Sequence, residues 1–236
     1  MKLLLVAGPP SVGKTSIIRW VIRELNQTTK ISYLKMDVVK AYEDIELKEE
    51  FGIETTKVYS ADLCPDHAEV MVLNDVYKWA SENGSDLLII ESAGLCLRCS
   101  PFLNQGVGVV VLNLTSGIHT IEKMQAIISF ADVAVLTKND LVSQAEREIY
   151  ICRLQEAHPN IKIIDTNALQ GTMLKQLSDI VIESDHIDIE KMELKGNPPL
   201  GTCTICIGSK KIGWENHYGV VRKLSGNITE YLYRGD

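Results

Sequence analysis

A glycine-rich loop near the start of the chain constrains its fold more than any other feature. Residues 8–15 read Gly-Pro-Pro-Ser-Val-Gly-Lys-Thr, which matches the pattern G-x-x-x-x-G-K-[ST]. An apolar run at residues 2–7 precedes the loop, and a stretch of helical period follows it. A strand that turns into a helix through such a loop is typical of phosphate sites, in which loop N–H groups and the helix N-terminus face the anion.

The loop pattern also predicts individual roles. We expect Lys14 to reach the β- and γ-phosphates of a nucleotide and the Thr15 hydroxyl to bind Mg²⁺. A Gly/Pro loop that only joins a strand to a helix is the alternative, and the eight-position match in this context argues against it. The expected phosphate contacts are Gly8, Ser11, Val12, Gly13, Lys14, Thr15 and Ser16.

The rest of the chain predicts an α/β fold: a mostly parallel, doubly wound sheet of the P-loop NTPase type, because short aliphatic runs alternate with longer stretches of helical period. Strands are expected at 2–7, 32–36, 87–91, 107–113, 133–137 and 162–165, and helices at 14–26, 67–82, 121–128, 143–157 and 172–182. The pattern changes after about residue 185. We therefore expect a P-loop domain over 1–184 and a small β-rich extension over 185–236, with strands at 202–207, 218–224 and 228–233.

Composition excludes several classes of protein. The chain has 24 Lys and Arg against 31 Asp and Glu, a net charge of −7, which argues against a nucleic-acid footprint. Its apolar runs are far shorter than the roughly 20 residues that span a bilayer, so no membrane partner is expected. The first apolar run is also too short for an export signal, and a cytoplasmic location is predicted.

Two further segments are placed to act at the terminal phosphate. Asp37 follows the second expected strand and could hold Mg²⁺ through water or orient the attacking water. Glu91 ends the third expected strand, and Gly94 lies three residues later as a flexible point beside the γ-phosphate. Lys14, Asp37 and Glu91 are the expected catalytic residues, and the choice between the two carboxylates as the group that orients water stays open. Thr15, Asp37 and Glu91 are also the expected residues of the magnesium site.

A base site is expected at the ends of two later strands. Asp140 in the segment Thr-Lys-Asn-Asp can accept from guanine N1–H and N2–H, while the Lys138 stem lies along the base. A site that satisfies two guanine donors rejects adenine, so GTP is favoured over ATP. Residues 167–169 follow the last strand and could offer a backbone N–H to guanine O6. The expected base-site residues are Thr137, Lys138, Asp140, Asn167, Ala168 and Leu169.

Two Cys-x-x-Cys pairs suggest metal or redox chemistry. Cys96 and Cys99 directly follow the Glu-x-x-Gly segment, so movement of that segment on hydrolysis would move both sulfurs. Two thiolates half fill a tetrahedral site, and a two-fold dimer would complete it for Zn²⁺, Cu⁺ or an Fe-S cluster, while square-planar Ni²⁺ is also compatible. Cys203 and Cys206 resemble a metal knuckle in the extension. The alternatives are buried packing for the first pair and a disulfide or free thiols for the second.

Over roughly residues 1–184 the chain resembles the SIMIBI-class GTPases that help to build metal centres: the nickel chaperone HypB, the urease accessory protein UreG and the cobalamin-associated CobW proteins. The resemblance rests on residues 8–15, Asp37, Glu-x-x-Gly at 91–94 and Thr-Lys-x-Asp at 137–140. Residues 64–68, Cys-Pro-Asp-His-Ala, resemble the Cys-Pro-His of UreG with one inserted residue. The resemblance implies that Cys64 and His67 bind nickel or zinc at a nucleotide-controlled dimer interface.

These observations together predict a GTP-hydrolysing metallochaperone. We expect a slow, partner-stimulated GTPase that uses GTP and Mg²⁺, forms a homodimer, and delivers a transition metal (Ni²⁺ or Zn²⁺) or cluster to a client metalloenzyme or cofactor-assembly protein. The alternatives are an Fe-S carrier or nucleotide-driven electron donor with a cluster between two subunits, a chaperone GTPase for a corrinoid enzyme, and a small P-loop kinase.

Overall fold

The structure, a computed structural model, describes residues 1–38, 41–60, 63–93, 100–197, 208–213, 216, 222–223 and 229–230. Its centre is a sheet in the order β7-β6-β5-β1-β4-β2-β3-β8-β9, in which the first seven strands are parallel. The parallel strands are β1 (Lys2–Ala7), β2 (Ile31–Asp37), β3 (Glu54–Tyr59), β4 (Leu87–Glu91), β5 (Val107–Asn113), β6 (Val133–Thr137) and β7 (Lys162–Asp165). The sequence-based prediction of an α/β, P-loop NTPase-like sheet is confirmed.

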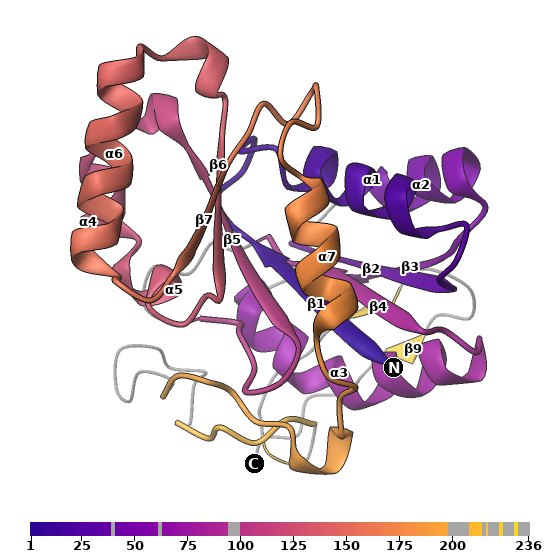
Figure 1. The fold of residues 1–236 in the computed structure, drawn as a ribbon. Helices are drawn as coiled ribbons and strands as arrows, with labels where there is room; N and C mark the ends of the chain where they lie inside the picture. Colours follow the sequence, from indigo (N-terminus) through magenta and orange to yellow (C-terminus); the bar gives the residue numbers. More distant parts are fainter. Residues whose placement is uncertain are drawn as a thin grey trace.

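Helices cover both faces of this sheet (Figure 1). Helices α1 (Lys14–Leu25), α2 (Glu43–Phe51) and α7 (Lys175–Glu183) share one hydrophobic cluster, and α3 (Pro65–Glu82), α4 (His119–Lys123), α5 (Gln125–Ile128) and α6 (Gln144–Ala157) share the other. Strands buried on both sides need continuous apolar runs, which β1 and β5 provide. The described residues also form three short 3-10 helices, η1 (Leu114–Ser116), η2 (Asn139–Leu141) and η3 (Ile189–Lys191).

Strand β3 and helix α2 occupy residues for which the sequence analysis expected no element. Strand β3 carries charged or polar residues at four of its six positions, Glu-Thr-Thr-Lys, and its burial is mixed. Helix α2 buries only Asp44 and Leu47. Both elements lie toward one side of the sheet, where a weaker hydrophobic pattern suffices. Glu91 consequently ends the fourth strand along the chain, not the third. The helix expected at 121–128 is divided at Met124 into α4 and α5.

Part of the expected extension packs against the P-loop domain. Ile187, Met192, Leu194 and Ile212 are buried in the same cluster as α3. The Lys195 amide donates to Phe102 O, and Gly213 N donates to Val70 O of α3. Strand β8 (Arg222–Lys223) pairs antiparallel with β3 and with β9 (Thr229–Glu230). The strand expected at 202–207, and most of those expected at 218–224 and 228–233, lie outside the described residues.

None of the described helices is both long enough and apolar enough to span a membrane.

The topology brings the predicted site residues to one edge of the sheet. In a parallel sheet all carboxyl ends face the same way, and ligands of open α/β folds bind there. The loop after β1, Asp37 at the end of β2 and Glu91 at the end of β4 meet at this edge, because β4 lies between β1 and β2. The ends of β6 and β7 carry the expected base site on the other side of β1.

Candidate functional site

The phosphate-binding loop is held against the sheet by its first glycine. A Cβ on Gly8 would lie 2.5 Å from Val111 O of the neighbouring strand β5, so no larger residue fits without moving the backbone. Gly13 has φ 101 at the N-cap of α1, a conformation that L side chains rarely adopt. The motif's glycines therefore fix both ends of the loop, and α1 begins at Lys14 with its N–H groups facing the loop.

Lys14 is buried and folded back onto its own loop. Its ammonium donates to Gly8 O at 2.8 Å and to Pro9 O at 2.9 Å. Burial lowers the pKa of Lys14 to about 8, although Glu91 acts in the opposite direction. An anion stabilises this desolvated cation more than the loop carbonyl oxygens do. The Lys14 ammonium should therefore exchange these oxygens for a phosphate.

Glu91 is the centre of the charged network at the carboxyl end of β4. Its carboxylate accepts from Thr15 Oγ1 at 2.9 and 3.0 Å, from the Tyr33 hydroxyl at 2.8 Å and from Lys35 Nζ at 2.7 Å. Only 1% of Glu91 is exposed. Burial and the adjacent Glu91 charge raise the pKa of Tyr33 well above its usual value. Burial disfavours the charged form of Lys35, but the neighbouring carboxylates outweigh it and raise the pKa. Glu91 is thus held in place as the common acceptor of three side-chain donors.

Tyr33, Lys35 and Glu43 belong to this site but were not predicted from the sequence. Lys35 pairs with Glu43 at 3.3 Å and lies 3.9 Å from Asp37. A signal was present: Tyr33, Lys35 and Asp37 alternate along β2 and therefore share one face, and a lysine inside a buried strand requires an anionic partner.

An open cavity of about 470 Å³ lies among these groups. The P-loop forms one wall, and Lys35, Asp37, Glu43 and Glu91 form another. Carboxylate and hydroxyl oxygens are the ligands that Mg²⁺ prefers, and the Thr15–Glu91 hydrogen bond leaves the Thr15 oxygen lone pairs for a cation. The residues present fit a magnesium-nucleotide. The predicted loop residues that line the cavity are Ser11, Gly13, Lys14, Thr15 and Ser16.

The expected base-site segments lie beside the P-loop. Thr137 Oγ1 donates to Val12 O at 2.7 Å, which ties the end of β6 to the loop. Trp20 of α1 donates to Ala168 O at 3.0 Å. Asn167 Oδ1 accepts from the Leu169 amide at 2.9 Å, so the Ala168 amide is the better candidate for guanine O6.

The side chains expected to recognise the base extend from these loops. Lys138 has φ 60, a left-handed conformation that turns the chain sharply after β6. Asp140 is exposed, and 83% of Leu169 is exposed. Both segments thus expose side chains at the carboxyl edge of the sheet, and their role in base recognition stays a prediction.

The first turn of α3 lies next to the segment that follows Glu91. Cys64 is the N-cap of α3 and His67 lies one turn later; both are half-buried. Asp66, between them, accepts from Ser92 Oγ at 3.0 Å and is buried. Glu69 is also buried, and burial, with the Asp66 charge, raises the pKa of Glu69 well above its usual value. The Ser92–Asp66 hydrogen bond therefore connects the Glu91 segment to the turn that carries Cys64 and His67.

The other predicted sulfur ligands lie outside the described residues: Cys96, Cys99, Cys203 and Cys206. The same is true of Gly94. Within the described ranges no group of three or more His, Cys, Asp and Glu side chains is arranged to hold a metal ion. Cys64 and His67 would thus need further ligands from the remaining cysteines or from a second chain.

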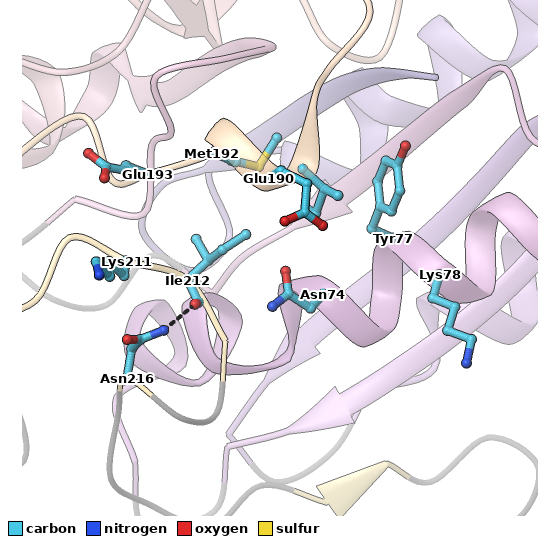
Figure 2. Close-up of a pocket in the computed structure, with 10 residues that line it drawn as sticks. Asn74, Tyr77, Lys78, Glu190, Met192, Glu193, Lys211, Ile212 and Asn216 are labelled. Carbon is cyan, nitrogen blue, oxygen red and sulfur yellow. Dashed lines mark hydrogen bonds between the residues drawn. The ribbon is translucent and has the colours of Figure 1, made fainter.

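A second cavity, of about 700 Å³, lies at the other half of α3. Figure 2 shows Asn74, Tyr77 and Lys78 of α3 on one side, with Glu190 and Met192 opposite. Asn216 closes one end and donates to Ile212 O at 2.9 Å. The residues that line it differ from all those predicted to bind nucleotide or metal.

Comparison with known proteins places the chain in a family. Residues 2–165 match the model of the CobW/HypB/UreG nucleotide-binding domain. An uncharacterised protein of Methanocaldococcus jannaschii is 38% identical over 96% of this chain and 97% of its own length.

Two solved structures share the fold. The hydrogenase maturation factor HypB of Archaeoglobus fulgidus is 24% identical, with a TM-score of 0.63 over 77% of this chain and 89% of its own. HypB of Helicobacter pylori, solved in complex with nickel, is 17% identical, with a TM-score of 0.62 over 80% of this chain and 91% of its own. With the match over residues 2–165, the chain belongs to the CobW/HypB/UreG family of P-loop nucleotide-binding proteins.

Proposed function

We propose that the protein is a GTP-hydrolysing metallochaperone in which the bound nucleotide controls a metal site that includes Cys64 and His67. The carrying observation is the hydrogen bond from Ser92 to Asp66, because Ser92 adjoins Glu91 and Asp66 lies between the two expected metal ligands. The nickel in the Helicobacter pylori HypB structure supports a metal cargo.

The hydrolytic step follows from the charged network. Lys14 binds the β- and γ-phosphate oxygens and stabilises their developing charge, and Thr15 and Glu91 together hold the magnesium position. Magnesium supplies charge neutralisation between the phosphates when it is bound. We assign the orientation of the attacking water to Asp37, because it lines the cavity while Glu91 already accepts from Thr15, Tyr33 and Lys35.

Coupling between nucleotide and metal follows from linkage. If GTP and the metal favour the same arrangement of residues 91–94 and the first turn of α3, each ligand tightens the other by the same factor. A homodimer supplies the remaining ligands, because Cys64 and His67 alone leave a metal under-coordinated. The client would be a metalloenzyme precursor or a cofactor-assembly protein that accepts the metal after hydrolysis.

Metal affinity measured with and without a non-hydrolysable GTP analogue tests this function. We expect the analogue to change Ni²⁺ or Zn²⁺ affinity by about tenfold in the wild type. Ser92→Ala should keep metal binding but abolish that change, whereas Cys64→Ala should weaken metal binding itself. A matched control is Ser143→Ala, which removes the serine hydroxyl that caps α6. Ser143 is far in the sequence from both Ser92 and Asp66. Equal metal affinity in the wild type with and without the analogue would contradict the proposal.

A further inference from the structure

Lys35 is a buried cation in the phosphate cavity. Without it, a bound magnesium ion would be the main positive charge in that cavity. Only 4% of Lys35 is exposed, yet it lines the phosphate cavity. Its ammonium is 2.7 Å from Glu91, 3.3 Å from Glu43 and 3.9 Å from Asp37. One ammonium group therefore pairs with three carboxylates from three different elements.

The charges of the cavity make this lysine consequential. Three carboxylates and two lysines line the cavity, and Lys14 is bonded to loop carbonyls. Of the two cavity lysines, Lys35 is the one in direct ion pairs with the carboxylates, while Lys14 acts on them only through space. A nucleotide adds further negative charge, and in a partly buried site such repulsion is little screened by salt.

We propose that Lys35 is a built-in cation that lowers the magnesium dependence of nucleotide binding. The inference rests on the proposed nucleotide function. Two electrostatic effects act in the same direction. In the absence of magnesium, Lys35 attracts the phosphates and offsets the repulsion from Glu91 and Asp37. In its presence, Lys35 repels the divalent ion and competes for the same oxygens.

The measurable quantity is a ratio of dissociation constants for a fluorescent GDP analogue. It is the constant measured in EDTA divided by the constant measured in excess magnesium chloride. Lys35→Met should raise this ratio by about tenfold or more, because metal-free binding weakens while magnesium binding strengthens. Lys35→Arg keeps the charge and should leave the ratio within about threefold of the wild type.

Lys57→Met is the matched control. Lys57 is the register partner of Lys35 on the adjacent strand and also forms a carboxylate pair, with Asp44 at 3.1 Å, but it does not line the cavity. The ratio should be unchanged in this variant. A ratio that rises equally in both methionine variants, or in neither, overturns the proposal.

Glu43→Gln provides a second test if Lys35→Met fails to fold with Glu91 left uncompensated. Removing the Glu43 charge frees Lys35 to face the phosphates, so the ratio should fall severalfold. An unchanged or higher ratio overturns the role of Lys35. If the wild type binds the GDP analogue under neither condition, the proposed function fails as well; if it binds and only the ratio is insensitive, the function stands and this inference falls.

Discussion

The phosphate end and the base end of the candidate site differ in how far they are organised without a ligand. At the phosphate end Lys14, Lys35 and Glu91 are buried and bonded to one another or to the loop. At the base end Asp140 is exposed, and 65% of the adjacent Leu141 is exposed. The loop backbones are anchored in both regions, but the described functional side chains are buried and hydrogen-bonded at the phosphate end and exposed at the base end.

This difference indicates which end of the site should supply nucleotide affinity and which should supply base selectivity. A preorganised, desolvated cation contributes strongly to anion binding because little reorganisation is needed. An exposed carboxylate contributes less affinity but discriminates between bases through the donors it accepts. We therefore expect the phosphate end to supply most of the affinity and the base end to supply the choice of base.

The largest expected effect is the loss of Lys14. Lys14→Met should weaken binding of a fluorescent GDP analogue by about 100-fold, because a buried charge-assisted contact to phosphate is lost. Lys138→Met, at the base end, should cost less than about tenfold. Fluorescence titration measures both losses. Equal losses in the two variants would contradict the conclusion that the phosphate end supplies most of the affinity.

Asp140→Asn should change the preferred base. The amide can donate to the 2-oxo group of xanthine, so the preference for guanine over xanthine should shift by about 100-fold. Because the side chain is exposed, the melting temperature should stay within about 2 °C of the wild type. Competition binding with GDP and xanthosine diphosphate measures the shift, and an unchanged preference would remove Asp140 from the base site.

Affinity for phosphates should fall as pH rises. The pKa of Lys14 is about 8 in the free protein, and a bound phosphate favours the charged form and raises it. Binding therefore takes up a proton above about pH 8, and GDP affinity should drop about tenfold between pH 7 and pH 9. Guanosine, which lacks phosphates, should show no such drop. A GDP affinity that is flat over this range would show that Lys14 does not meet the phosphates.

The smallest expected effect tests the rigidity of the phosphate end. Tyr33→Phe removes one donor from the buried Glu91 carboxylate and should lower the free energy of unfolding by about 1 to 2 kcal/mol. Tyr42→Phe, with 54% of the residue exposed, should change it by less than about 0.5 kcal/mol. Urea denaturation of both variants gives the difference, and an equal effect would mean that the network does not depend on the Tyr33 hydroxyl.

Much of the fold was predictable because it depends on local patterns. The glycines and lysine of residues 8–15 fix a strand-loop-helix unit, and helix α3 was expected at 67–82 and observed at 65–82. Strand β3 and helix α2 were missed because partly exposed elements need few apolar residues. The Lys35–Glu91 pair was missed for another reason: its members are 56 positions apart and meet through the register of β2 with β4, which a sequence does not display.

Within the candidate site, the predicted residues that the structure describes fall into two groups. The positions of Lys14, Thr15 and Glu91 follow from the motif and from strand ends, and the structure brings them together. Cys64 is the N-cap and His67 lies in the first turn of α3, but a complete set of metal ligands depends on residues that no local pattern can place. Their roles remain predictions for the experiments above.

Helix α3 has one further consequence. Its 18 residues form a continuous rod, about 27 Å long, that starts beside Ser92 and passes Asn74, Tyr77 and Lys78 at the wall of the second cavity. Because an unbroken helix moves as one body, tilting its first turn shifts that distant wall. The helix thus mechanically links the surroundings of Ser92 to the wall of the second cavity.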